Sequence, residues 1–216
     1  MENTEVVLGE NPQKNRTVEQ VLSACRPKAE RRYKPVLEKN GLTFPPDHLE
    51  LLAFKEEQRL EIYTHKGPEK ILLHSYDFTA ISGKRGPKRM EGDKQIPEGV
   101  YGVEYLNPNS RFHISLKVAY PNARDRAWAT RAGIENAGTD IFIHGGALSI
   151  GCIPIGDTYI EELFPLVALT GTENVRILIF PNDARQTGSF LPCEVCPDDT
   201  DELYRELQAE LKAFVP

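Results

Sequence analysis

The 216-residue chain lacks several features that would assign it to a broad class. No apolar run approaches the ~20 residues that a membrane-spanning helix requires, so we expect no membrane span. Positive charge is not in excess, because 26 Lys and Arg residues stand against 32 Asp and Glu residues for a net charge of −6. Without a basic stripe, nucleic acid is not an expected partner. The first residues also lack the basic and apolar regions of a secretory signal, which taken alone predicts a cytoplasmic protein.

Cysteine is scarce, and three uses are open for the one pair with recognisable spacing. The four cysteines are Cys25, Cys152, Cys193 and Cys196, of which the last two form a Cys-x-x-Cys pair. Such a pair can be half of a zinc site, a redox pair or a local disulfide. No second pair and no nearby pair of histidines completes a metal site, so we expect no metal and no cofactor. In an oxidising compartment a disulfide is the favoured use.

The remaining composition is that of a globular domain. Hydrophobic residues make up 40% and charged residues 27% of the chain, which is ordinary for a soluble protein. The length suffices for one domain with extensions. We divide the chain into a tail and helical extension (1–44), a catalytic domain (45–182), and a Cys-x-x-Cys loop with a C-terminal helix (183–216).

Helical patterns occur in four places. Thr17-x-x-Gln20 is typical of a capping box that opens a helix, and Pro27 is expected to divide it from a second helix over 28–39. A short helix is expected over 122–131, and Thr158-x-x-Glu161 predicts another that ends at Gly171. After Asp199, an apolar stripe predicts an amphipathic helix docked on the domain.

Strand patterns dominate the middle of the chain. The segments 49–54 and 59–65 predict a hairpin, and 112–120 alternates so that one face is expected to be core and the other wetter. The unbroken apolar segment 175–180 predicts a central strand. Six or seven strands without repeated βαβ alternation predict a mostly β, α+β fold: an antiparallel sandwich or barrel-like core with peripheral helices. The remaining predicted strands are 70–78, 100–106 and the apolar run that begins at 141.

The segment 141–152, IFIHGGALSIGC, carries the strongest chemical signal. A buried strand runs into His144, and eight positions later Gly151 precedes Cys152. A thiol becomes a good nucleophile once an imidazole takes its proton, which predicts Cys152 as nucleophile and His144 as base. Glycine beside the cysteine allows a tight turn whose N–H groups, from Ile150, Gly151 and Cys152, would form an oxyanion hole. The plainer alternative is an inert buried cysteine and a structural histidine.

This segment and three others together resemble the L,D-transpeptidase catalytic domain (YkuD-type) family, and within it the YafK-like branch. GDKQIPEGVY (92–101) is similar to the family's Gly-Asp-x-x-x-Pro-x-Gly-x-Tyr segment. SGKRGPK (82–88) and SLKVAYPN (115–122) resemble further landmarks of the branch. The resemblance covers about residues 45–182 and implies a β-rich domain of the L,D-transpeptidase type.

The resemblance also implies the reaction and the roles of further residues. The family transfers acyl groups on peptidoglycan stem peptides: the cysteine attacks the amide after the third residue, and the thioester then passes to an amine or to water. The backbone carbonyl of Gly145 occupies the position that orients the imidazole. Ser149 is expected to brace the turn or contact substrate. Lys84, Arg85 and Lys88 are expected either to reach carboxylates of the stem peptide or to lie on a solvated loop.

Two departures from the family pattern bear on the direction of the reaction. Ile150 stands where a second histidine is usual, and Ile153 where an arginine is usual. We therefore favour an amidase or hydrolase that releases peptidoglycan-linked lipoprotein. The alternatives are a transpeptidase that forms 3-3 cross-links or attaches lipoprotein, a non-catalytic wall-binding module and a secreted toxin. The resemblance implies a periplasmic or secreted monomer from which a signal has been removed.

Overall fold

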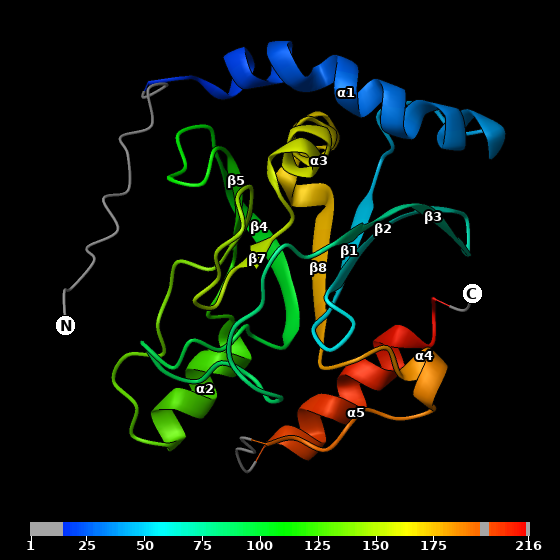
Figure 1. The fold of residues 1–216 in the computed structure, drawn as a ribbon. Coiled ribbons are helices and arrows are strands. Elements are labelled where there is room, and N and C mark those ends of the chain that lie inside the picture. The colour runs from blue at the N-terminus through cyan, green and yellow to red at the C-terminus, as the bar shows by residue number, and fades with distance from the viewer. Residues whose placement is uncertain (1–14, 195–198, 215–216) are drawn as a thin grey trace.

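The computed structural model describes residues 15–194 and 199–214 (Figure 1). Its strands are β1 (Leu49–Phe54), β2 (Arg59–Lys66), β3 (Glu69–Asp77), β4 (Gly99–Asn107), β5 (Ser115–Val118), β6 (Phe142–His144), β7 (Ile153–Pro154) and β8 (Val175–Phe180). Its helices are α1 (Val18–Lys39), α2 (Ala123–Arg131), α3 (Asp157–Thr170), α4 (Ala184–Thr187) and α5 (Thr200–Leu211), with a 3₁₀ turn η1 (Thr172–Asn174).

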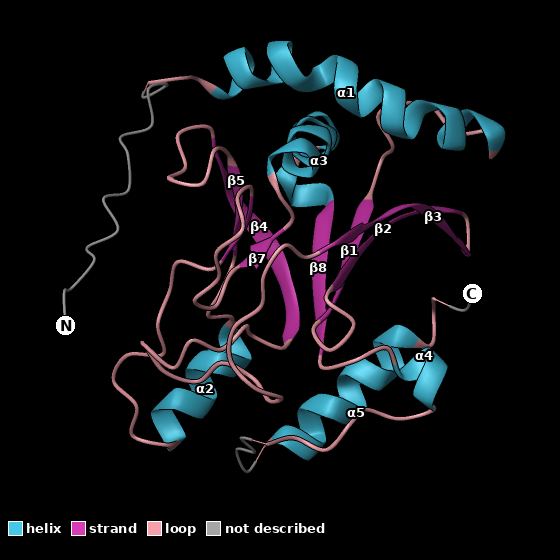
Figure 2. Ribbon diagram, in the orientation of Figure 1, coloured by secondary structure: helices cyan, strands magenta, loops and turns pink. Residues whose placement is uncertain are grey.

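One curled sheet contains all eight strands, in the order β3-β2-β1-β8-β4-β5-β6-β7 (Figure 2). As predicted, the apolar strand β8 is central; it pairs in parallel with β1 and antiparallel with β4. The β6–β7 pair is also parallel, and the remaining pairs are antiparallel. Helices cover this mixed sheet, which confirms the α+β class of a β-rich core with peripheral helices.

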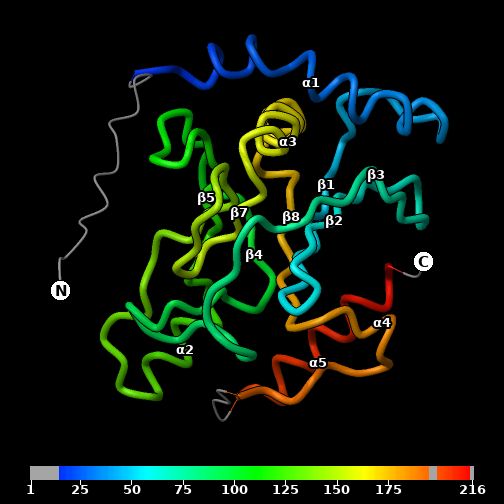
Figure 3. Tube along the Cα trace, viewed as in Figure 1, coloured from blue at the N-terminus to red at the C-terminus, as the bar shows by residue number. Residues whose placement is uncertain are grey.

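Each face of the sheet is covered by different helices. Because side chains alternate along a strand, Leu51 and Ile177 face one side while Leu52 and Leu178 face the other. The first side packs against α3, with α1 lying across α3 at the top of Figure 1. The second side packs against the apolar stripe of α5, and the tube view in Figure 3 places this helix at the opposite end of the molecule from α1. The predicted docking of the C-terminal helix is therefore confirmed.

Helix α1 begins at the predicted capping box, with Thr17 accepting from the Gln20 amide at 3.2 Å. The predicted break at Pro27 is wrong, because α1 continues through both Pro27 and Pro35. Both prolines lie on the exposed side of the helix, so the carbonyls that lose a helical partner face water. The opposite side is buried, and its packing stabilises the continuous helix; its buried residues are Val21, Cys25, Ala29, Tyr33 and Leu37.

Three other local predictions need correction. Strand β5 spans only Ser115–Val118, and all four residues are buried. One face contributes Leu116 and Val118 to the core beneath α3, and on the other face the ring of Phe142 covers Lys117. Helix α3 begins at Asp157 with Gly156 at the N-cap, so Thr158 does not cap it. Asp199 occupies the N-cap position of α5, but its carboxylate pairs with Arg89 instead of capping the helix.

The other elements agree with the sequence patterns. The hairpin of β1 and β2, the helix α2 and the end of α3 at Gly171 are confirmed. The predicted disulfide of Cys193 lies outside the described residues, because Cys196 falls within 195–198.

Candidate active site

Parallel pairing of β6 and β7 brings the two ends of the 144–152 segment together. Ile143 pairs with Ile153 and His144 with Pro154, so Cys152, one residue earlier, lies beside Phe142. Phe142 and His144 point to the same face of the sheet, since they are two residues apart on one strand. The pairing therefore brings Cys152, directly before β7, next to the strand that carries His144.

The imidazole of His144 is held on one side and unpartnered on the other. Its Nδ1 lies 2.5 Å from the carbonyl oxygen of Gly145, which assigns the proton to Nδ1. Its Nε2 is buried and has no hydrogen-bond partner within residues 15–194 and 199–214. The ring of Phe112 stacks on the imidazole with centroids 4.6 Å apart. Burial lowers the pKa of His144, against the opposing effects of the Gly145 carbonyl and of Asp157.

The thiol of Cys152 donates to the carbonyl oxygen of Asp140 at 3.5 Å. Burial raises its pKa, the Phe142 backbone lowers it, and the Asp140 carboxylate raises it. The ammonium groups of Lys117 and Lys88 lower it. With the thiol pKa raised and the imidazole pKa lowered, the pair rests as neutral thiol and neutral imidazole at neutral pH.

The first glycine of the turn, Gly145, has no room for a side chain. A Cβ at Gly145 would lie 2.4 Å from Asp157 Oδ1 and 2.9 Å from the Phe112 carbonyl oxygen. The next amide, of Gly146, donates to the same Asp157 oxygen at 2.8 Å, and Thr79 donates to the Gly146 carbonyl at 2.7 Å. The backbone after His144 is therefore anchored at two points.

Ser149 closes the second half of the turn. Its hydroxyl donates to the carbonyl of Cys152 at 2.7 Å and lies 2.9 Å from the hydroxyl of Ser82. It also accepts from the amide of Gly151 at 3.3 Å, so one N–H expected in the oxyanion hole has a partner in this conformation. The Ile150 side chain, 78% exposed, projects from the turn into solvent.

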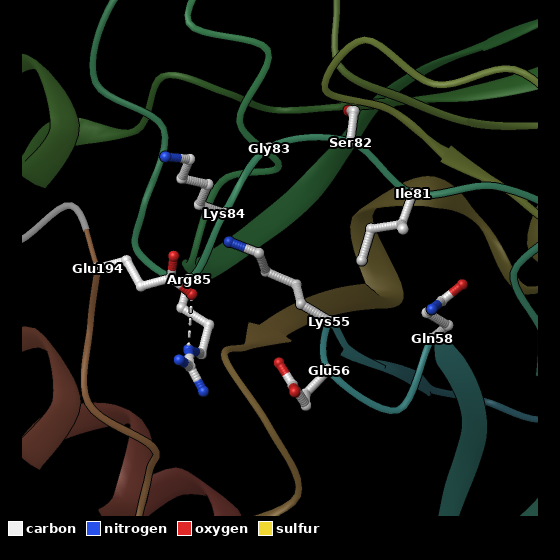
Figure 4. Close-up of a pocket in the computed structure, with 9 residues that line it drawn as sticks. All are labelled: Lys55, Glu56, Gln58, Ile81, Ser82, Gly83, Lys84, Arg85 and Glu194. Atoms are coloured by element: carbon white, nitrogen blue, oxygen red, sulfur yellow. Dashed lines mark hydrogen bonds and ion pairs between the residues drawn. The ribbon is translucent and has the colours of Figure 1, made fainter.

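The two candidate lysines have different surroundings. Lys88 is 4% exposed, and its ammonium donates to Asp93 and to the Met90 carbonyl, both at 2.8 Å. Neither a solvated loop nor direct contact with a substrate carboxylate therefore describes Lys88 in this structure. Lys84 lines an open pocket of about 380 Å³, where Arg85 pairs with Glu194 at 3.0 Å (Figure 4). Ser82 lines the same pocket and connects it to Ser149.

Sequence reasoning missed Phe112, Lys117, Asp140 and Gln95. The alternating pattern of its strand placed Lys117 on the wet face. Phe142 on the neighbouring apolar strand covers the Lys117 ammonium instead, and the apolar character of that strand was the available signal. The backbone carbonyl of Gln95 would lie 3.0 Å from a Cβ at Gly151, so the 92–101 segment packs directly under the nucleophile turn. That contact joins segments far apart in the sequence, and no local pattern indicates it.

Two further properties concern the described part of the chain. It has no group of three or more His, Cys, Asp or Glu side chains placed to hold a metal ion. None of its helices combines the length and apolar character needed to cross a membrane.

Comparison with known proteins places this site in a family. Residues 50–179 match the family model described as the L,D-transpeptidase catalytic domain, YkuD. "Putative L,D-transpeptidase YafK" of Escherichia coli strain K12 is 38% identical over 133 residues, or 59% of this chain and 52% of that protein. The protein of the same name in Escherichia coli O157:H7 gives the same values. The chain thus spans about half the length of the curated relatives it matches.

A solved structure shares the fold. The helical cell shape determining protein Pgp2 from Campylobacter jejuni aligns with a TM-score of 0.52 at 21% identity, over 62% of this chain and 48% of that one. At this identity the likeness concerns the fold alone. The family match covers more than half of the chain, and the chain therefore belongs to the L,D-transpeptidase catalytic domain (YkuD) family.

Proposed function

We propose that this protein is a cysteine-dependent acyl-transfer enzyme that acts on peptidoglycan stem peptides through a thioester. Cys152 is the nucleophile, His144 its base, and the Gly145 carbonyl orients the imidazole. The observation that carries the proposal is the state of His144: Nδ1 is held at 2.5 Å by Gly145, while the buried Nε2 has no partner in the described part of the chain. A buried nitrogen without a partner is costly in a protein interior, which favours a role in proton transfer.

The proposed reaction follows from this geometry. Nε2 of His144 takes the thiol proton, and Sγ of Cys152 attacks the amide carbonyl that follows the third stem residue. The resulting oxyanion is stabilised by N–H groups of the 150–152 turn. The tetrahedral intermediate collapses when His144 returns the proton to the leaving amine, and a thioester remains. Water or an amine then attacks the thioester while His144 takes its proton. The bond between the acyl carbon and Sγ breaks, and Cys152 recovers the proton from His144.

We favour water as the acceptor, and hence an amidase that releases peptidoglycan-linked lipoprotein. The exposed Ile150 occupies the position of the usual second histidine, and Ile153 that of the usual arginine, so this side of the turn offers no polar side chain at these two positions. Water needs no binding site for a second peptide. The proposed location is the periplasm or the cell exterior, and Lys84 is the proposed contact for a carboxylate of the stem peptide.

A non-catalytic wall-binding module is the second candidate. The raised pKa of the Cys152 thiol and its orientation favour this candidate. Burial raises the pKa of Cys152, and in the described part of the chain no hydrogen bond links its sulfur to His144. A binding module would bind the wall with an unreactive Cys152. The third candidate, a transpeptidase, uses the same thioester and differs only in the acceptor.

A digest of peptidoglycan that carries bound lipoprotein, analysed by mass spectrometry, tests the proposal. The wild type and Cys25→Ala, which removes a buried thiol on α1, should release lipoprotein and leave tripeptide ends. Cys152→Ala should release none. New cross-links between diamino acid residues, lost in Cys152→Ala, would assign a transpeptidase instead. Unchanged peptidoglycan that nevertheless binds the wild type would replace the enzyme proposal with a binding module.

A further inference from the structure

A lysine ammonium is buried close to the nucleophile. The side chain of Lys117, on β5, is only 5% exposed. Its ammonium donates to Asp140 Oδ1 at 2.5 Å and to Thr139 Oγ1 at 3.2 Å, and it lies 4.9 Å from the ring centroid of Phe142. Burying a cation costs free energy that a single, largely exposed carboxylate only partly offsets. The Asp140 side chain is 73% exposed.

The strand register places Lys117 and Cys152 in one row across the sheet. Tyr105 pairs with Lys117, and Lys117 pairs with Phe142. Cys152 lies beside Phe142 on the next strand, because Ile143 pairs with Ile153. Neighbouring strands lie about 4.8 Å apart, so about two strand spacings separate Lys117 from Cys152. Phe142 lies between them, with its ring under the ammonium.

Asp140 contacts both groups. Its carboxylate pairs with Lys117, while its carbonyl accepts the Cys152 thiol at 3.5 Å. Its backbone has φ +57°, a left-handed conformation that few residue types tolerate. The ion pair therefore anchors the same residue that holds the thiol in place.

We propose that Lys117 and Asp140 act as opposed positioning residues that set how readily Cys152 ionises. Lys117 favours the thiolate through its positive charge. Asp140 favours the neutral thiol through its carbonyl and its negative charge. Ionisation moves the proton from Sγ to Nε2 of His144, and the sulfur leaves the Asp140 carbonyl. The inference rests on the proposed function only in taking Cys152 as the nucleophile.

The other charged groups around the sulfur come from different elements. Lys88, in the loop before β4, is neutralised by Asp93 at 2.8 Å. Asp157, at the start of α3, acts on His144, whose pKa its negative charge raises. The effects on the Cys152 pKa agree with the geometry. Burial has the largest effect and raises the pKa, and the Phe142 backbone lowers it. The Asp140 charge then raises the pKa, and the Lys117 charge lowers it.

Thiol alkylation across a range of pH tests the inference without any wall substrate. Each variant is pulsed with iodoacetamide, and labelling of the Cys152 peptide is measured by mass spectrometry. Lys117→Met should slow alkylation at neutral pH by roughly fivefold to tenfold and move its pH profile to higher pH. Asp140→Asn should move the profile to lower pH, since asparagine tolerates the left-handed backbone and the carboxylate is exposed. The double variant should lie near the wild type.

The matched control is Lys34→Met, which removes the same charge from the exposed face of α1 and should leave the profile unchanged. Shifts of Lys117→Met and Asp140→Asn in the same direction, or profiles identical to the wild type, would overturn the inference. If Lys117→Met does not fold, Asp140→Asn alone tests the inference. A pH profile of alkylation that is unchanged in Asp140→Asn, or that moves to higher pH, then refutes the inference. Opposed shifts in a protein that leaves peptidoglycan intact would uphold the inference while the proposed function fails.

Discussion

The ring of Phe112 lies flat on the imidazole of His144, with centroids 4.6 Å apart and planes inclined by 23°. Phe112 comes from the loop before β5, whereas His144 ends β6, so the stack joins two segments distant in the sequence. It covers one face of the ring that we propose as the base. Through this contact an apolar side chain contributes to the burial that lowers the pKa of His144.

Phe112→Ala should shift the acidic limb of activity to higher pH. His144 acts as a base only when neutral, and burial holds its pKa below its usual 6.5. Activity should therefore fall as the pH falls through this lowered pKa. Without the Phe112 ring, water reaches the imidazole and part of its desolvation is removed. The pKa of His144 therefore rises, and the loss of activity begins at higher pH. A pH–rate profile checks this, with Phe190→Ala, a half-buried phenylalanine packed against α5, as the control.

Gly145→Ala should destabilise the protein by about 1–3 kcal/mol and abolish most activity, since the new methyl group overpacks the turn. Its Cβ would lie 2.4 Å from Asp157 Oδ1 and 2.9 Å from a backbone oxygen, and the backbone cannot yield without moving His144. Gly102→Ala is the matched control, because a Cβ there meets nothing within 4 Å. Urea denaturation of both variants measures the difference, and equal midpoints would contradict the steric argument.

Asp93→Asn should cost about 2 kcal/mol of stability at neutral pH, and the loss should shrink in acid. Burial tends to raise the pKa of Asp93, but its hydrogen bonds from Lys88 and from three backbone amides outweigh burial and lower it. A lowered carboxyl pKa contributes stability that is present above the unfolded pKa and lost as pH falls through the folded one.

Denaturation of Asp93→Asn and the wild type at neutral and acid pH measures this dependence. Asp77→Asn, at the exposed end of β3, serves as the control and should cost little at either pH. A difference from the wild type that stays constant with pH would show that the Asp93 charge is not what stabilises the loop.

Leu37→Ala should destabilise the protein by about 2–5 kcal/mol, because Leu37 is fully buried on the packed side of α1. Leu72→Ala, at a side chain 45% exposed on β3, should cost far less. Calorimetry of both variants decides whether α1 is an integral layer of the fold. A single cooperative transition at the wild-type temperature in Leu37→Ala would show that it is not.

Local pattern determined much of this protein. The unbroken apolar run of β8 predicts a strand covered on both faces, and that strand is central. The Thr17 capping box, the hairpin of β1 and β2 and the end of α3 at Gly171 follow from signals within a few residues. The chemistry that we propose for the segment from His144 to Cys152 rests on its own residue types and spacing.

Tertiary structure decided the rest, because burial depends on which segments become neighbours. The stripe of α1 that packs on α3 keeps the helix continuous through Pro27, although a proline read locally predicts a break. Side chains of Phe142, Thr139 and Asp140 cover Lys117, although the alternating sequence of its strand predicts a wet face. The stack of Phe112 on His144 and the contact of Asp140 with Cys152 join residues that no short pattern connects. Sequence therefore indicates the groups that we propose to react, whereas the assembled sheet sets their burial and their orientation.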